Sequence, residues 1–198
     1  MKKAALIIAC VTSLLAFNAH AGALAIIGAG PASSSALDGA VGYSVDGELA
    51  WSWTDDIDRS SIGLSFGYVG GLDGAGAMWG DENATGSMSA FTVAPRVGMV
   101  FPVTERVGFY LQGQFGVSRI DAKASGLYDD VTRWGSASGS DWGFSWGFGA
   151  GLDFNIAKRQ TLRVGYSLLS LGNFNTGSGH EFAPGYLHGL IIAYSIQF

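Results

Sequence analysis

The chain has 198 residues, of which 31 are glycine and 4 are proline; only 14% are charged, although 48% are hydrophobic. An average soluble domain carries about 7% glycine and about 25% charged residues, so this composition fits neither a disordered segment nor an ordinary soluble domain. The 16 acidic and 11 basic residues give a formal net charge of −5, which argues against nucleic-acid binding. Much of the surface must therefore contact something other than water.

The first 21 residues have the pattern of an export signal. Two lysines precede an apolar segment at residues 4–17, and residues 19–21 (Ala-His-Ala) form a small-x-small cleavage site. We expect cleavage after this site, which leaves residues 22–198 as one domain without cysteine, because Cys10 is the only cysteine. A lipoprotein site at Cys10 is an alternative, but its apolar segment would have only about six residues, fewer than such signals use.

Beyond the signal, no uncharged apolar run reaches the roughly 18 to 20 residues that a membrane-spanning helix needs. Instead, apolar residues alternate with small or polar ones, which indicates strands with one apolar face. In residues 142–156 every even position is apolar, and every odd position is Gly, Ser, Asp or Asn. The same alternation recurs at residues 41–54, 62–68, 91–101, 107–118, 162–168 and 189–198. Together with a weaker pattern at residues 23–30, these segments predict eight strands.

The connectors between these segments alternate in length. The short ones are residues 55–60, 102–105 and 157–160, and the long ones, rich in loop-forming residues, are 31–40, 69–89, 119–141 and 172–184. Short turns at one end and long loops at the other are typical of a bacterial outer-membrane barrel. We therefore predict an all-β fold, an eight-stranded antiparallel up-and-down transmembrane β-barrel. A soluble barrel is the alternative, but an eight-stranded interior is too narrow for so many Trp and Phe side chains.

The alternation assigns the large apolar side chains to the lipid and the charges to the barrel interior. Aromatic residues near the strand ends would form two belts at the membrane surfaces: Trp53, Phe101, Phe154 and Phe198 near the turns, and Tyr43, Phe91, Trp142 and Tyr186 near the loops. Seven polar residues are predicted to form an interior network: Asp46, Glu48, Arg96, Gln112, Gln114, Asp153 and Arg163. We interpret this network as a structural plug of ion pairs and amides. Pro95 should cost its strand a ladder hydrogen bond or mark a bulge.

Four stretches resemble the small outer-membrane barrels of the Ail/OmpX (Ail/Lom) type, within the wider opacity-protein-like group. They are Trp142-Gly143-Phe144-Ser145-Trp146-Gly147 running on to Phe154, Ala94-Pro95-Arg96 with Val107-Gly108-Phe109-Tyr110, and the C-terminus Tyr194-Ser195-Ile196-Gln197-Phe198. The resemblance is good from about residue 91 to residue 198. It implies a protein of the cell outer membrane that acts through extracellular loops in adhesion, in host or envelope contact, or in envelope structure.

The resemblance also implies partners. Tyr194, Ile196 and Phe198 resemble the C-terminal signal that the outer-membrane assembly machinery reads. Outer-membrane lipids and lipopolysaccharide would surround the barrel, and an unidentified surface ligand would contact the loops. Candidate contacts are Trp79, Tyr128 and Trp134, because aromatic side chains supply much of the binding energy of interfaces. We expect a monomer with no cofactor, no metal and no nucleic-acid partner.

A lipid-modifying enzyme of the deacylase or acyltransferase type is the main alternative, and a very narrow pore is another. Acyl chemistry needs a serine nucleophile, a histidine base and an orienting carboxylate. After the signal, the chain offers only His180 and His188. Ser178, His180 and Glu181 share the last loop, but neighbours on a glycine-rich loop need not converge, and the His-x-Ser arrangement of the deacylases is absent. We therefore do not expect an enzyme.

Overall fold

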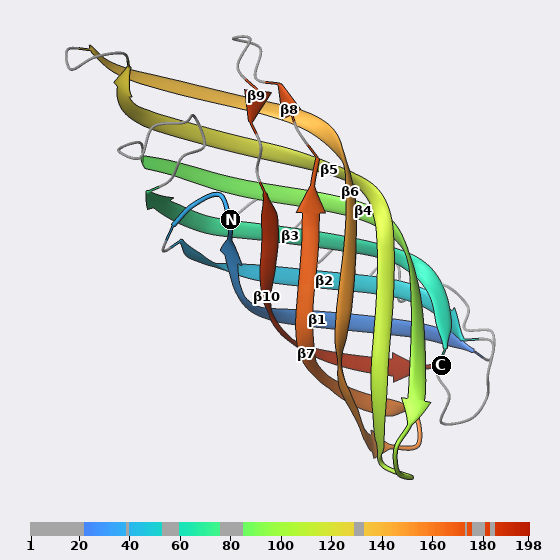
Figure 1. Ribbon diagram of the computed structural model, residues 1–198. Coiled ribbons are helices and arrows are strands. Elements are labelled where there is room, and N and C mark those ends of the chain that lie inside the picture. The colour runs from blue at the N-terminus through green and yellow to red at the C-terminus, as the bar shows by residue number, and fades with distance from the viewer. Residues whose placement is uncertain are drawn as a thin grey trace.

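Eight long strands form a closed barrel in which every neighbouring pair is antiparallel (Figure 1). The computed structural model describes residues 22–38, 40–52, 60–75, 85–128, 133–172, 174–175, 181–182 and 185–198. The strands are β1 Ala23–Ser34, β2 Val41–Ser52, β3 Ser61–Ala75, β4 Thr85–Pro102, β5 Val107–Tyr128, β6 Arg133–Ala157, β7 Gln160–Leu171 and β10 Tyr186–Gln197. Two short strands, β8 Phe174–Asn175 and β9 Glu181–Phe182, pair with each other only. The predicted eight-stranded antiparallel barrel is thus confirmed.

The first and last strands close the barrel. β1 pairs with β10 on one side and with β2 on the other, so the weakly patterned segment at residues 23–30 is a full strand. The predicted export signal, residues 1–21, lies outside the described residues. Within the described ranges there is no helix long and apolar enough to cross a membrane.

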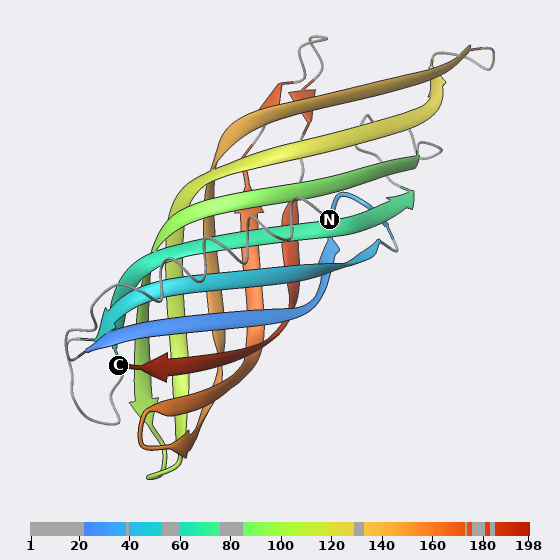
Figure 2. The ribbon, with the colours of Figure 1, turned by 180° about the vertical axis from the view of Figure 1, so that it is seen from behind.

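The strands are unequal in length. β1, β2, β7 and β10 have 12 residues each, whereas β3, β4, β5 and β6 have 15, 18, 22 and 25. The four longer strands run side by side far beyond the rim at one end of the barrel (Figure 2). The prediction of a loop at residues 119–141 is therefore wrong for most of that segment, because the β5–β6 ladder continues without interruption to Tyr128 and Arg133.

In the central band of the barrel, the outward face is apolar. Phe144 and Phe148 are 61% and 62% exposed, whereas Ser145 and Gly147, which lie between them in the strand, are buried. A water-soluble barrel does not expose such a continuous apolar surface, which is what contact with hydrocarbon requires. The aromatic residues expected near the loops are all exposed: Tyr43, Phe91, Trp142 and Tyr186. Near the turns, Phe101 is exposed, Phe154 and Phe198 are half-buried, and Trp53 lies outside the described residues.

Along β5 the polarity of the two faces inverts at Arg119. Before this residue, outward side chains such as Phe115 are apolar and inward ones such as Gln114 are polar. After it, outward side chains such as Lys123 are charged and exposed, and inward ones such as Ile120 are apolar and buried. The second arrangement is that of a sheet with one face in water. The membrane boundary therefore lies at this level, where the register aligns Arg119 with the outward aromatic rings of Phe91 and Trp142.

Beyond this boundary the interior has an apolar core of its own. We call residues 71–75, 85–90, 119–128 and 133–141 of β3, β4, β5 and β6 the projecting sheet. Its inner face packs against the β1–β2 connection and the ends of β7 and β10 in one cluster of buried residues: Leu37, Ala40, Leu72, Met88, Ala90, Ile120, Ala122, Leu171 and Leu187. Leu37 is only 1% exposed, so the β1–β2 connection inserts its side chain into the mouth of the barrel.

Pro95 interrupts one ladder of β4. On the β3 side Pro95 opposes Leu64 in the regular register. On the β5 side the ladder omits Ala94 and Pro95 and resumes in the same register at Arg96. Pro31 interrupts the β1–β10 ladder in the same way. Proline has no N–H to donate, so each proline interrupts the hydrogen-bond ladder with one neighbouring strand and leaves the ladder with the other neighbour intact. The register does not shift at either proline, so neither marks a bulge.

We predict that Gly116→Ala destabilises the barrel by about 1–3 kcal/mol, because the neighbouring strand would have to move. A Cβ on Gly116 would lie 2.2 Å from the Val93 carbonyl oxygen and 2.6 Å from the Ala94 Cα, beside the interrupted ladder. Gly67→Ala is the matched interior control, since its Cβ would meet nothing nearer than an Asp46 carboxylate oxygen at 3.6 Å. Urea unfolding from lipid vesicles measures both variants. Equal stabilities would contradict the close strand approach at Gly116.

A second prediction tests which face meets the lipid. Phe148 lies midway along β6 between Trp142 and Phe154, with its side chain outward. Phe148→Arg should lower the free energy of unfolding from lipid vesicles by about 2–4 kcal/mol, because the charge would face hydrocarbon. Phe148→Leu is the control that keeps an apolar side chain. An arginine variant as stable in lipid as the leucine variant would disprove the lipid-facing assignment.

Candidate functional site

Arg96 is the centre of the interior network. Its guanidinium donates to Asp46 (Nη2 to Oδ1, 2.9 Å), to Glu48 (Nη1 to Oε2, 3.1 Å) and to Gln114 (Nε to Oε1, 2.9 Å). Arg96 comes from β4 and both carboxylates come from β2, so these contacts span the strand between them. β3 carries Ser65 and Gly67 on its inner face at this level, and these small residues leave the space that the ion pairs cross.

A second ion pair lies nearer the turn end. Arg163 of β7 makes a bidentate contact with Asp153 of β6 (Nε to Oδ1, 2.8 Å; Nη2 to Oδ2, 3.0 Å). Its Nη1 also donates to the side-chain oxygen of Gln112 at 3.2 Å. Paired hydrogen bonds of this kind fix both the position and the orientation of the two groups. Arg163 is therefore held against the β5 and β6 walls of the barrel.

Tyr110 belongs to this second group of contacts, although it was not among the predicted site residues. The Arg163 guanidinium carbon lies 4.0 Å from the centre of the Tyr110 ring, and the ring is fully buried. A Cβ at Gly151 or Gly165 would lie 2.8 Å or 2.2 Å from atoms of Tyr110, so both glycines make room for it. The sequence pattern that could have identified Tyr110 is an aromatic residue at an interior position of β5, at the same level as glycines on the next two strands.

The structure brings the seven predicted interior residues into two adjoining clusters that join five strands. Asp46, Glu48, Arg96 and Gln114 form one cluster, and Gln112, Asp153 and Arg163 form the other. Each of the five charged groups contacts an opposite charge, and all five are largely shielded from solvent. Side chains held by so many partners fill space and fix strand positions, because moving one would leave a buried charge unpaired.

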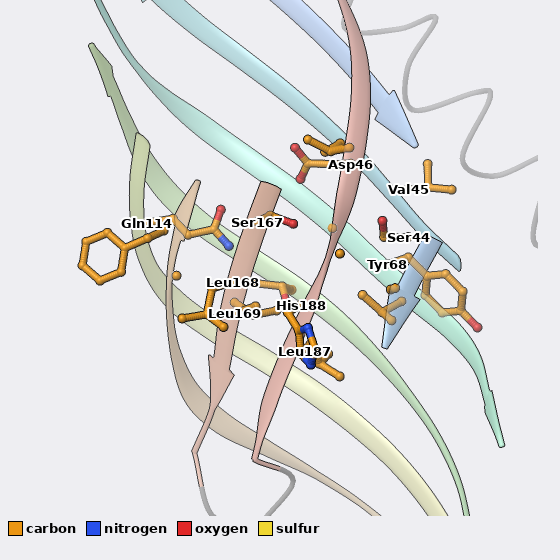
Figure 3. A pocket seen from close by; sticks show the side chains of 18 of the residues that line it. Ser44, Val45, Asp46, Tyr68, Gln114, Ser167, Leu168, Leu169, Leu187 and His188 are labelled. Carbon is orange, nitrogen blue, oxygen red and sulfur yellow. The ribbon is translucent and has the colours of Figure 1, made fainter. Parts of the chain in front are cut away.

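A cavity of about 70 Å³ lies between the interior network and the apolar cluster at the barrel mouth (Figure 3). Polar side chains, among them Asp46, Gln114 and Ser167, line one part of it, and Leu169 and Leu187 line another. A water molecule needs roughly 10–15 Å³ of such space, so the cavity has room for a few waters and not for an organic substrate. The cavity is thus suited to hydrating the network.

The predicted contact aromatics occupy the loop end of the barrel. Tyr128 is the last residue of β5 and Trp134 is the second residue of β6, so both backbones lie at the tip of the longest hairpin. Trp79 lies outside the described residues.

The predicted assembly signal lies on β10, where this strand pairs with β1 and closes the barrel. Tyr194 points outward and is exposed, and Ile196 is half-buried. The backbone N–H of Phe198 donates to the carbonyl oxygen of Ala23 at 2.9 Å. The C-terminus is therefore tied to the start of β1, which it must meet for the barrel to close.

His188 contacts a serine that sequence reasoning did not connect with it. Both ring nitrogens of His188, on the outward face of β10, lie 3.4–3.5 Å from the Ser33 hydroxyl of β1. The Tyr166 ring lies beside it, with ring centres 6.2 Å apart. In the described part of the chain no carboxylate hydrogen-bonds to His188, and no group of three or more His, Cys, Asp and Glu could hold a metal. His180 lies outside the described residues.

We predict that Arg96→Met costs about 3–5 kcal/mol of stability, because Asp46 and Glu48 would remain as unpaired buried carboxylates. Arg119→Met is the matched control, since its ion pair with Asp121 (3.6 Å) is about half exposed and should be worth only about 0–1 kcal/mol. Adding Asp46→Asn and Glu48→Gln to Arg96→Met should recover part of the loss. Urea unfolding from lipid vesicles compares the four proteins. Similar losses for Arg96→Met and Arg119→Met would contradict a stabilising interior network.

The barrel resembles solved outer-membrane proteins in fold. Neisserial surface protein A is 13% identical with a TM-score of 0.61, over 89% of this chain and 97% of that one. A major outer membrane protein of Thermus thermophilus is 12% identical with a TM-score of 0.56, over 90% and 100%. Ail, the attachment invasion locus protein of Yersinia pestis, is 16% identical with a TM-score of 0.45, over 90% and 100%. No curated protein sequence matches the chain.

The solved structures show a similar fold, and a family model assigns the chain to a family. The model described as outer membrane protein beta-barrel domain matches residues 4–186, which include β1 to β9 and the first residue of β10. The closed barrel, its apolar outward band and its polar interior have the form expected of such a protein. The predicted resemblance to small outer-membrane barrels is confirmed: the chain belongs to the outer-membrane β-barrel family.

Proposed function

We propose that the protein acts at the cell surface, where the projecting sheet contacts a ligand on a host cell or on the envelope. The observation that supports this most directly is the polarity inversion at Arg119. A connector that merely joined two strands would need no buried core of its own. Here four strands continue past the membrane boundary and bury an apolar cluster, so they present a pre-formed surface to the outside. Pre-formed surfaces bind with a smaller entropy cost than flexible loops.

The outward face of the projecting sheet has a chemistry suited to polar ligands. Six hydroxyl side chains lie on it: Thr85, Ser87, Ser89, Ser125, Ser138 and Ser140. Arg119 and Asp121 form an exposed ion pair on the same face, and Arg119 also donates to Ser140 at 3.5 Å. Hydroxyls that both donate and accept hydrogen bonds, with few fixed charges, favour contact with a glycan or a peptide backbone over binding of a polyanion.

A lipid-modifying enzyme is a second candidate, and the Ser33–His188 contact favours it. The pair faces the membrane two residues below Tyr186, at the loop end of β10, where ester groups of the outer leaflet would lie. A serine and a histidine alone lack the orienting carboxylate that acyl chemistry uses. We therefore keep the surface contact as the proposed function, with no catalytic role for His188.

The test compares adhesion of bacterial cells that display the protein with adhesion of cells that lack it. Replacing Trp79, Tyr128 and Trp134 with alanine should reduce adhesion to cultured epithelial monolayers, because interfaces concentrate their binding energy in aromatic residues. Val103→Ala with Glu105→Ala, in the exposed turn at the opposite end, should leave adhesion unchanged.

Heat-modifiable electrophoretic mobility reports the amount of folded barrel for each variant. Adhesion that persists in the alanine variant at an equal amount of folded protein would contradict the proposed contact residues. Adhesion that is the same with and without the protein would contradict the proposed function itself.

A further inference from the structure

The lipid-facing surface of β4, β5, β6 and β7, which are neighbours in the barrel wall, contains an open groove of about 470 Å³ (Figure 1). We call it the outer groove. Its floor has two small outward residues, Gly113 and Ala150, and larger apolar and aromatic side chains surround them: Val97, Met99, Leu111, Phe148, Tyr166 and Leu168. A Cβ on Gly113 would meet nothing nearer than a Phe148 ring carbon at 4.0 Å, so the space above the floor is open. The groove has the volume of a small-molecule site, roughly 300–1,000 Å³.

The outer groove contacts hydrocarbon, because it is part of the apolar outward band. Phe148 and Tyr166, which line it, are 62% and 46% exposed on that band. Within a membrane, apolar surfaces associate through van der Waals packing, since lipid chains are as apolar as the protein. A chain that lies in a groove has protein atoms on several sides, and each close pair of atoms adds to the attraction. The groove is therefore suited to holding an acyl chain in one position.

The strand register gives the outer groove a direction across the membrane. One row of paired outward residues descends from β10 to β3: His188, Leu168, Phe148, Gly113, Val97 and Ile62. His188 is the third residue of β10, at the loop end, whereas Ile62 is the second residue of β3, at the turn end. The groove occupies the middle of this row, from Leu168 to Val97. With the loops outside, as in bacterial outer-membrane barrels, the groove descends in the direction of an outer-leaflet acyl chain.

A polar pair, Ser33 and His188, lies at the upper end of this row. His188 pairs with Leu168 of the groove, and its ring centre lies 6.2 Å from that of Tyr166, which also lines the groove. The Ser33 hydroxyl lies 3.4–3.5 Å from the His188 ring nitrogens. Such contacts are longer than the usual 2.7–3.2 Å, so both groups keep the capacity to bind a further partner. Ionisable side chains at membrane depth are rare and commonly mark a functional site.

We propose that the outer groove binds one hydroxyacyl chain of lipopolysaccharide, with Ser33 and His188 hydrogen-bonded to the polar start of that chain. A serine hydroxyl both donates and accepts hydrogen bonds, and a neutral imidazole has one donor and one acceptor nitrogen. The start of a hydroxyacyl chain carries a carbonyl oxygen, which accepts, and a hydroxyl, which also donates. The ester of a phospholipid offers acceptors only. The lipid site is separate from the surface contact of the projecting sheet and does not depend on it.

The experiment counts the lipid A molecules, the acylated anchor of lipopolysaccharide, that stay bound to the folded full chain in native mass spectrometry as lipid A is titrated. Ala150→Leu fills the groove floor. Ala29→Leu is the matched control, because Ala29 is an exposed outward alanine midway along β1 and outside the groove. We expect one lipid A on the wild type and on Ala29→Leu, and about tenfold weaker binding to Ala150→Leu, since leucine takes the space of the packed chain. If Ala150→Leu does not fold, Gly113→Leu replaces it, with the same expectation.

A second pair of variants tests the polar contact. Ser33→Ala with His188→Leu removes both polar groups and keeps the surface apolar, so lipid A binding should fall about tenfold through the lost hydrogen bonds. Tyr194→Phe is the control, because it removes an outward hydroxyl near the turn end of the same β10 strand. Its lipid A binding should equal that of the wild type. Heat-modifiable electrophoretic mobility reports the amount of folded barrel for each variant.

Several outcomes would overturn the proposal. They are a wild type that retains no lipid A, or wild-type affinity in the folded groove variant or in the Ser33→Ala, His188→Leu protein. Phosphatidylglycerol that binds the wild type as tightly as lipid A would show that a phospholipid occupies the groove. A dimer that forms in place of the lipid complex and is lost in the groove variant would show that a second copy occupies it. Either result also contradicts the site proposed for lipopolysaccharide.

Discussion

Closure of the hydrogen-bond ladder is the constraint on which the rest of this structure depends. Hydrocarbon offers no partner to a backbone N–H or C=O, so every strand that crosses it must pair on both sides. β1 and β10 meet that requirement by pairing with each other although they lie at opposite ends of the chain. Closure then forces the side chains to alternate between lipid and interior, which is the pattern that the sequence carries.

An eight-stranded barrel leaves an interior only wide enough for side chains, and the interior network fills it. Arg96 reaches two carboxylates across an intervening strand because that strand has only small residues at the crossing. Tyr110 fits because Gly151 and Gly165 face it. The high glycine content of the chain thus has a steric cause: charged and aromatic side chains on some strands need empty positions on the next.

Past the membrane boundary the same strands meet water on one face, and their polarity inverts. Outward residues become polar, while inward residues join Leu37 of the β1–β2 connection in an apolar core. Closure is no longer required there, because water can bond to an unpaired backbone. The sheet opens, and the β1–β2 connection lies against its β3 edge. The surface function proposed for this protein follows from that release of the closure constraint.

The sequence by itself determined the barrel, its strand count and the lipid-facing residues, because period-two alternation such as that of residues 142–156 is a local property that only a membrane strand would carry for so long. The same alternation also predicted that the seven polar residues of the network point into the barrel. It could not show that residues 119–141 are mostly strand, since glycine and serine suit a loop unless a neighbouring strand supplies their backbone partners. Nor could it pair Arg96 with Asp46 and Glu48, place Tyr110 against Arg163, or bring Ser33 to His188. Those contacts join residues far apart in the chain, and only the closed register of the barrel brings them within reach of one another.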